Sequence, residues 1–248
     1  MTPPLLSDEA KDFSDDTEPA EPVQQTRRSQ RPALLVLGVI GVLLLGFAAG
    51  ILVGNPLRQT QETPGTVDVG FSQDMSVHHA QAVQMSGIAL AGASDTEVRR
   101  LAYDILTTQA NQAGRMQGWL QLWGKPFVGP DGYMGWMSDM SDMPGMSGMQ
   151  HGATAQHTGP VQTMPGMATE QELSTLRTAT GPALDTLFLQ LMLRHHQGGM
   201  PMIQYAAQHA DTDAVRSLAD SMVKTQTSEA QLMAQMLKDR GAAQLPLN

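Results

Sequence analysis

An internal duplication restricts the fold of this chain more than any other feature. Residues 71–124 align without a gap to residues 188–241 at a constant offset of 117 positions, and 18 of the 54 aligned pairs are identical. Both segments contain an adjacent His pair in the context Phe-x-Gln-x-Met-x-x-His-His. We therefore expect two copies of one structural unit.

Each copy has the apolar spacing of two helices joined by a turn. In the first copy, apolar or small residues recur three or four positions apart, as on one face of a helix: Phe71, Met75, His78, Ala82, Met85 and Ala89. Ser94–Glu97 resembles a capping box that opens a second helix, and Gly124 suits its end. In the second copy, Asp211 is the expected N-cap and Gly241 the stop, and Thr169–Glu172 predicts a further short helix. The sequence thus predicts an all-α four-helix bundle made of two helical hairpins.

One long apolar segment precedes the duplicated region. Residues 32–54 contain no charged residue, and roughly 20 such residues span a bilayer. A cleaved signal peptide is the alternative, although its apolar region is usually about 7 to 15 residues long. Arg27, Arg28 and Arg31 precede the segment and only Arg58 follows closely. The positive-inside rule then predicts a single-pass anchor in the cell membrane, with a cytoplasmic N-terminus and an extracytoplasmic C-terminal part.

These features predict seven parts. They are a disordered cytoplasmic tail (1–31), a transmembrane anchor (32–54), a linker (55–65), a first helical hairpin unit (66–124), a Met/Gly-rich loop (125–168), a second helical hairpin unit (169–241) and a C-terminal tail (242–248). The first tail is rich in Asp, Glu, Pro, Ser and Gln, a composition typical of disorder.

Composition excludes several kinds of site. The chain has no cysteine, which rules out disulfides, Cys-based zinc sites and thiol catalysis. It carries a formal net charge of −9 and has no basic run after Arg31, so nucleic acid is not an expected partner. No Ser/His/Asp set, phosphate loop or nucleotide fingerprint is recognisable. A soft metal site would have to use methionine and histidine.

Methionine and histidine share one face of the first helix in each unit. A methionine stripe at helical spacing is usually core packing, and a single buried histidine is usually only hydrogen-bonded. Two adjacent imidazoles in both copies are different, because burying a polar group without a partner costs about 1 to 3 kcal/mol. We therefore favour a metal role, with the adjacent His79 and His196 as ligands or as groups that orient ligands. The candidate ligands are His78, His79, His195, His196, Met75, Met85, Met192, Met202, Met116 and Met233.

The donor set indicates copper. Thioether and imidazole without thiolate select Cu(I), and imidazole also accepts Cu(II). A carboxylate-bridged di-iron centre would instead require Glu-x-x-His motifs, and the chain contains none.

A second group of methionines lies between the units. Six of them follow one another at three-residue intervals among Gly, Pro, Ser and Asp: Met134, Met137, Met140, Met143, Met146 and Met149. With little apolar sequence beside them, these thioethers are expected to be largely exposed, as in a segment that collects Cu(I). The alternatives are a linker with incidental methionines and a reversible sink for oxidants.

The helix with the His pair, followed by VRSLADSMVKTQTSEAQLM and preceded by a Met/Gly/Pro-rich stretch, resembles the domain-of-unknown-function 305 family. The similarity covers roughly residues 66–124 and 165–241. It implies a ferritin-like helical bundle and a relation to extracytoplasmic copper-binding proteins. The family pattern of His-His, Gln-x-x-Glu and Met is matched in the second unit by Gln226, Glu229 and Met233. The first unit departs from it, with Gln112 where the Glu is expected.

Taken together, the sequence predicts a membrane-anchored extracytoplasmic protein that binds copper for sequestration, tolerance or transfer and is not an enzyme. The expected partners are copper ions, the lipid bilayer and a copper-delivery or acceptor protein. Two alternatives stay open. One is a metal-dependent oxidase that acts on metal ions or reactive oxygen. The other is a helical interaction module without metal, whose His pairs are hydrogen-bonded core.

Overall fold

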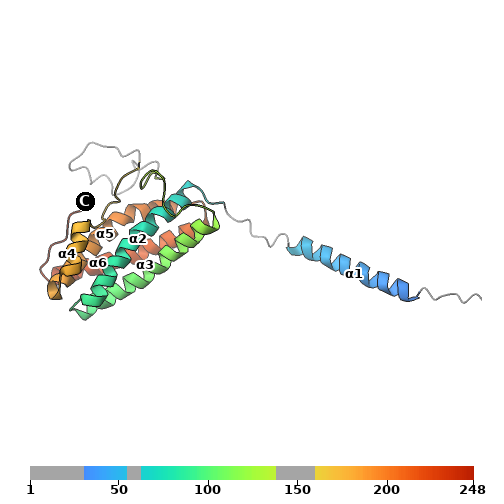
Figure 1. Cartoon of the computed structure of the whole chain (residues 1–248), viewed down its shortest axis with the longest axis horizontal. Coiled ribbons are helices and arrows are strands. Elements are labelled where there is room, and N and C mark those ends of the chain that lie inside the picture. The colour runs from blue at the N-terminus through green and yellow to red at the C-terminus, as the bar shows by residue number, and fades with distance from the viewer. Residues whose placement is uncertain (1–30, 55–62, 138–159) are drawn as a thin grey trace, which may run out of the picture. The chain divides into compact units, whose positions relative to one another are not determined.

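The computed structural model describes residues 31–54, 63–137 and 160–248 and divides into two units, residues 1–60 and 61–248. The first unit holds α1 (Arg31–Gly54). The second holds α2 (Thr66–Gly92), α3 (Thr96–Leu122), α4 (Glu170–Thr178), α5 (Gly181–His209) and α6 (Asp213–Asp239) (Figure 1). The described residues form no strand beyond one isolated bridge between Tyr133 and Val161. The predicted all-α fold is confirmed.

The N-terminal helix α1 is long and apolar enough to cross a membrane over Leu34–Ile51. Its apolar side chains are exposed rather than packed into a core, with Leu35 and Leu45 more than 70% exposed. By length and composition the helix fits either a membrane span or a signal sequence.

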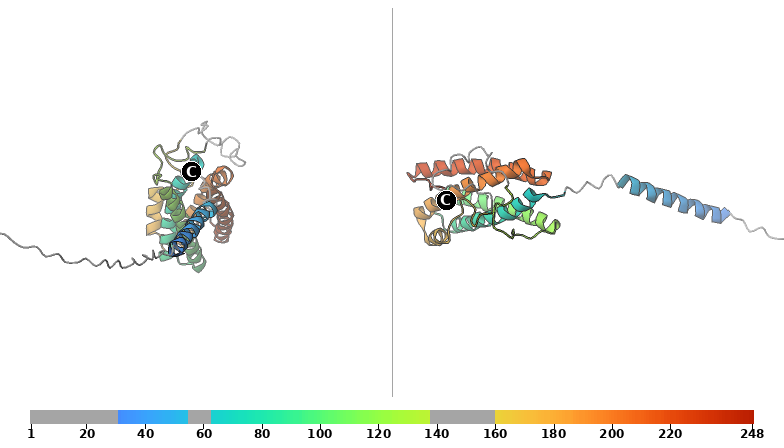
Figure 2. Two further views of the ribbon diagram at one scale, coloured as in Figure 1. Left: turned by 90° about the vertical axis from the view of Figure 1, so that its right-hand side faces the viewer. Right: turned by 90° about the horizontal axis from the view of Figure 1, so that it is seen from above.

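The second unit is a bundle of two antiparallel hairpins. The helices α2 and α3 pack as one hairpin, α5 and α6 pack as the other, and the two hairpins meet mainly through α2 and α5. The long helices run side by side with nearly parallel axes (Figure 2). The buried core between them includes Phe71 and its aligned residue Phe188, both completely buried. The two predicted helical hairpins are confirmed, and their first helices form the central contact.

The helix ends follow the sequence signals with two differences. The capping box of α4 is as predicted: the Thr169 N–H donates to the Glu172 carboxylate, and the Thr169 hydroxyl accepts from the Glu172 N–H. The N-cap of α3, however, is Asp95 rather than Ser94, and that of α6 is Thr212 rather than Asp211. The two observed N-caps are aligned positions of the duplicated units.

Two buried aspartates explain why the caps are shifted by one residue. Asp68, near the start of α2, accepts hydrogen bonds from the backbone N–H groups of Asp211 and Thr212, both at 3.0 Å. Asp185, near the start of α5, accepts from the backbone N–H groups of Ser94 (2.9 Å) and Asp95 (3.0 Å). Each hairpin therefore closes the turn of the other, and the residues before the N-caps are used in that contact.

We expect Asp68→Ala to destabilise the bundle by roughly 2 to 4 kcal/mol, because hydrogen bonds to a charged group are worth about 1.5 to 3 kcal/mol and their buried donors would lose their partner. Urea unfolding of the full chain in detergent, followed by circular dichroism, measures the change. Asp220→Ala, at an exposed position of α6, is the control and should change little. Equal midpoints for the two variants would contradict a structural role for Asp68.

Candidate metal centre

The core of the bundle brings together one histidine from each unit. His78 on α2 and His195 on α5 are aligned residues of the duplication, and their ring centroids lie 3.7 Å apart with an angle of 31° between the planes. Both rings are almost completely buried. The two helices can approach closely at this point because α5 has glycine at position 199, where a Cβ atom would lie 2.7 Å from Cε1 of His78.

A short segment before α4 closes the same site from outside. Gly198 allows the carbonyl oxygen of Pro165 to come within 2.3 Å of the position that a Cβ atom would occupy. Gly166, with φ of +78°, packs its backbone against the Cα atom of His195. Arg194 then holds the start of α4 by two hydrogen bonds to the Glu172 carboxylate, at 2.9 and 2.7 Å. Gly199 thus makes room for the ring of His78, and Gly198 makes room for the segment before α4.

We expect Gly199→Ala to destabilise the bundle by about 1 to 3 kcal/mol, the usual cost of overpacking a core, because the added methyl group would displace the His78 ring. Gly118→Ala in α3 is the matched control: its Cβ atom would meet open space, and a Gly-to-Ala change in a helix stabilises by up to about 1 kcal/mol. Thermal unfolding of the two variants should shift in opposite directions. A stabilising effect of both would contradict the close ring contact.

The second histidine of each pair is held by a hydrogen bond to the other helix of its own hairpin. Nε2 of His79 lies 2.8 Å from Oε1 of Gln112, and Nε2 of His196 lies 2.8 Å from Oε2 of Glu229. Gln112 and Glu229 are themselves aligned residues. Because an oxygen accepts in both pairs, Nε2 carries a proton, and in the neutral form of each ring the lone pair is on Nδ1. The duplication therefore preserves the geometry of the bond but places a carboxylate in only one half.

Burial keeps the rings of His78, His79 and His195 neutral. It lowers the pKa of His78 to about 3, an effect reinforced by the neighbouring His79 and His196. It also lowers the pKa of His79 to about 4, against the opposing effect of the Gln112 hydrogen bond. The pKa of His195 is likewise lowered well below its usual value, first by burial and then by the other histidines. Uncharged imidazole is the form that binds metal ions.

Five buried ring nitrogens of the four histidines have no hydrogen-bond partner within the described residues. They are Nδ1 and Nε2 of His78, Nδ1 of His79, Nε2 of His195 and Nδ1 of His196. The Pro165 carbonyl slightly favours a charged His78 ring, but it does not form a well-oriented hydrogen bond. Buried polar atoms nearly always have a hydrogen-bond partner in folded proteins. Five ring nitrogens without a partner in one core therefore require an explanation.

The six predicted bundle methionines are all completely buried and form two trios. One packed cluster contains Met75, Met116 and Met202, and another contains Met192, Met233 and Met85. In the alignment of the two units, each methionine of the first trio is paired with a methionine of the second trio. Because α2 and α5 run antiparallel, the trios lie on opposite sides of the His78–His195 contact, and each combines residues of both units.

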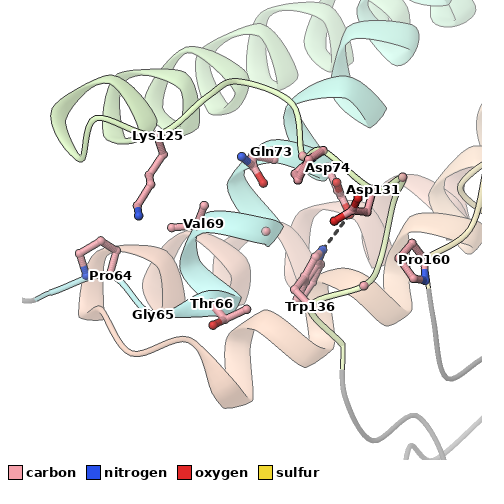
Figure 3. A pocket seen from close by; sticks show the side chains of 15 residues that line it. Pro64, Gly65, Thr66, Val69, Gln73, Asp74, Lys125, Asp131, Trp136 and Pro160 are labelled. Carbon is pink, nitrogen blue, oxygen red and sulfur yellow. Dashed lines mark hydrogen bonds between the residues drawn. The ribbon is translucent and has the colours of Figure 1, made fainter.

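The exposure predicted for the methionine run is wrong for its first two members. Met134 and Met137 are buried and pack in the same cluster as Met75. The cause is Asp74, whose carboxylate accepts from the Met134 N–H at 2.6 Å and from Nε1 of Trp136 at 2.7 Å (Figure 3). These bonds fold the segment back onto α2, although desolvation of the carboxyl still raises the pKa of Asp74. Met140, Met143, Met146 and Met149 lie outside the described residues.

Two functional contributions were not predicted from the sequence. Asp74 is the anchor of the loop, and its aligned residue is Leu191, so the duplication gave no sign of it. Asp68 and Asp185 could have been found, because they also differ by 117 positions and extend the alignment by three residues.

The described residues contain no group of three or more His, Cys, Asp or Glu side chains arranged to hold a metal ion. The methionine thioethers are the other soft donors beside the histidines of this core. The ligand roles assigned to individual residues stay predictions.

A family model for a domain of unknown function, DUF305, matches residues 68–237. The chain belongs to the DUF305 family. A search of curated protein sequences found no match. Among solved structures, a DUF305 protein from Streptomyces coelicolor that is described as secreted is 43% identical, with a TM-score of 0.61 and coverage of 73% of this chain and 97% of that chain. A DUF305 fragment from Deinococcus radiodurans is 29% identical, with a TM-score of 0.54 and coverage of 71% and 98%.

A third structural neighbour connects the fold with copper. CopM in its Cu(II)-bound form is 25% identical to this chain, with a TM-score of 0.50 and coverage of 69% of this chain and 96% of CopM. Copper binding is thus found among the structural neighbours of this DUF305 protein. Its histidine and methionine core is the part of the bundle with donors suited to that metal.

Proposed function

We propose that this DUF305 protein is a membrane-anchored, extracytoplasmic copper-binding protein that holds Cu(I) in its bundle for sequestration, tolerance or transfer. The observation that supports it most strongly is the set of five unpartnered, buried imidazole nitrogens between two methionine trios. Each such nitrogen costs folding free energy unless something binds it. A soft metal ion would use the lone pairs that the protein leaves unpaired.

Charge balance supports Cu(I) over Cu(II) as the bound form. Burial lowers the pKa values of His78, His79 and His195 and keeps these rings neutral, and the Glu229 carboxylate contacts His196. A monocation beside one carboxylate leaves the buried site close to electrical neutrality, whereas a dication adds an uncompensated charge, which is costly to bury. The thioethers add donors without adding charge, and they favour Cu(I) as well.

The hydrogen bonds of His79 and His196 support Nδ1 as the ring atom that would bind the metal ion. With Nε2 fixed by Gln112 or Glu229, Nδ1 of His79 and of His196 is free and buried. A bond from the remote ring nitrogen to a carboxylate orients a metal-binding imidazole and increases its basicity. We therefore propose stronger binding in the half that contains Glu229 than in the half that contains Gln112.

A groove lies between α3 and α6 on the surface of the bundle. It has a volume of about 370 Å³, and its lining includes Gln112, Thr108 and Ser221. Since Gln112 contacts both the groove and His79, we propose this groove as the route by which copper reaches the site.

The proposed location combines two observations. The helix α1 is suited to cross a membrane, and the Streptomyces coelicolor relative is described as secreted. The arginines before α1 favour a cytoplasmic N-terminus, which places the bundle outside the cytoplasm. Met140, Met143, Met146 and Met149 would then collect copper and pass it to the bundle or to an acceptor protein.

Anaerobic titration of the full chain in detergent with Cu(I), against a competing chelator, tests the proposal. We expect the wild-type chain to take Cu(I) from the chelator, and a variant with Met140, Met143, Met146 and Met149 changed to Leu to retain the tight site. We propose binding rather than catalysis, so the loaded protein should not consume oxygen or peroxide beyond one equivalent. A chain that does not compete for Cu(I) would refute the copper role, and sustained turnover would favour the oxidase alternative.

A further inference from the structure

One end of the bundle exposes a set of large apolar side chains. On the last turns of α3 and just after it, Leu122 is 67% exposed, and Phe127 and Val128 are each 54% exposed. Trp119 and Trp123 are half-buried beside them, with ring centroids 6.2 Å apart. We call these five residues the aromatic end. Such a cluster on a protein surface marks an interaction site more often than scattered apolar residues do.

The second copy of the unit has polar or charged residues at three of these five positions. At the aligned positions, Leu122 corresponds to Asp239 and Trp123 to Arg240, both in or next to the end of α6. At the same offset, Phe127 corresponds to Gln244. Trp119 and Val128 correspond to the apolar Met236 and Leu245. The bundle therefore accepts charged and polar side chains at the other three positions, so Leu122, Trp123 and Phe127 need an explanation other than folding.

The two helix ends lie at opposite ends of the bundle. Arg240 donates to the carboxylate of Asp95, which places the end of α6 at the turn between α2 and α3. The end of α3 instead lies beside the start of α2. Lys125 and Pro64 line one pocket of about 480 Å³ there (Figure 3), and Gln73 of α2 donates to the carbonyl of Pro126 at 2.8 Å. The end of α3, with its exposed apolar residues, is thus the helix end that lies next to the point where the chain enters the bundle.

The connection to α1 limits how far that point can be from a membrane. Nine residues, 55–63, separate Gly54 at the end of α1 from Pro64. The extended chain from Gly54 to Pro64 reaches at most about 36 Å, at 3.3 to 3.6 Å per residue. If α1 crosses a bilayer, the start of α2 and the adjacent aromatic end cannot be further than this from its surface.

The chemistry of this end suits a bilayer surface. Tryptophan favours the interface between water and hydrocarbon, where its amphipathic ring contacts both, and phenylalanine and leucine supply the apolar side chains that enter the boundary of the acyl chains. The stretch 105–130 contains no Asp or Glu in a chain of net charge −9, while it contains Arg115 and Lys125. Arg115 lies over the Trp119 ring at 5.4 Å. Lipid headgroups would therefore contact cations and aromatic rings. The first acidic residue after this stretch is Asp131, which lines the same pocket as Lys125.

We propose that the aromatic end inserts into the interfacial region of the bilayer that α1 anchors, so that the bundle is seated on the membrane rather than held away from it. The proposal rests on the anchoring part of the proposed function and is independent of copper. Seating would fix the open groove and the histidine core at a defined height above the lipid surface.

Tryptophan fluorescence of the full chain in lipid nanodiscs tests the seating directly. All three tryptophans of the chain, Trp119, Trp123 and Trp136, lie in the bundle, so α1 contributes no background. In discs whose lipids carry bromine near the headgroups, we expect quenching of Trp119 and Trp123 but not of the buried Trp136, relative to discs of the same unbrominated lipid. The double variant Trp119→Phe/Trp123→Phe should lose this quenching.

A second variant separates seating from the reporter residues. Leu122→Asp/Phe127→Gln introduces apolar-to-polar changes that match the second unit and keeps all three tryptophans, so quenching should fall towards zero. Leu232→Asp, at a position of α6 that is 49% exposed, should leave it unchanged. If the chain elutes with the discs but brominated lipid does not quench it, the seating is refuted and the anchor stands. If the chain does not elute with the discs, both are refuted.

Discussion

We expect the double variant His78→Leu/His195→Leu to lose tight Cu(I) binding and to keep, or exceed, the stability of the metal-free wild-type bundle. The two rings contact each other in the core, and three of their four nitrogens have no hydrogen-bond partner among the described residues. Leucine has a similar volume and removes these unpaired polar atoms. Each such atom costs about 1 to 3 kcal/mol, which offsets the loss of packing.

The loss in copper affinity should be large. Removal of groups that only orient a metal ligand typically costs 10- to 100-fold in affinity, so loss of two ligands should lower Cu(I) affinity by more than about 100-fold. The chelator competition titration measures affinity, and thermal unfolding of the metal-free protein measures stability. His209→Leu, at an exposed position near the end of α5, is the control. Unchanged affinity together with a strong loss of stability would show that the histidines are structural core.

The stability of the metal-free bundle should fall steeply as the pH decreases from about 6.5 to about 4. His78, His79 and His195 have lowered pKa values in the folded chain, mainly because they are buried, and return to about 6.5 when the chain unfolds. Between the two values the unfolded chain binds more protons, so protons favour unfolding. The stabilising effect is complete above pH 6.5 and is lost as the pH falls towards the folded pKa values.

Each of these histidines contributes a slope of about 1.4 kcal/mol per pH unit. Asp74, whose pKa is raised by burial, contributes a slope of the opposite sign. It therefore cancels at most the slope that one histidine contributes. Urea unfolding at a series of pH values measures the slope. The His78→Leu/His195→Leu variant should remove two of the three contributions. A slope that is the same in this variant and in the wild-type chain would contradict neutral, buried histidines.

The sequence predicted the hairpins well because their signals are local. The spacing of apolar residues, the capping box at Thr169 and the glycines at 124 and 241, which adopt φ of +64° and +62°, each depend on a few neighbouring residues. The constant offset of 117 then implied two similar units. Long helices with this pattern have few alternative folds.

The contacts between hairpins could not be predicted in the same way. Adjacent residues such as His78 and His79 point in directions about 100° apart on a helix, and only packing decides which meets the other hairpin. The burial of Met134 and Met137 likewise depends on Asp74, about 60 residues earlier, and on Trp136 packing over Gly70, where a Cβ atom would lie 2.3 Å from the indole ring. No local pattern reports contacts of that kind.

The reciprocal contacts of Asp68 and Asp185 have a consequence for the origin of the chain. Asp68 of one unit binds the turn of the other and Asp185 does the reverse, while His78 meets its own counterpart, His195. A pair of identical subunits related by a twofold axis makes contacts of this kind, in which residue i touches j and j touches i. An ancestral single hairpin would have left both its turn and its histidine face incomplete. The present chain is therefore best understood as the fusion of a homodimer, with the histidine core on the former symmetry axis and with Gln112 and Glu229 as a position at which its halves differ.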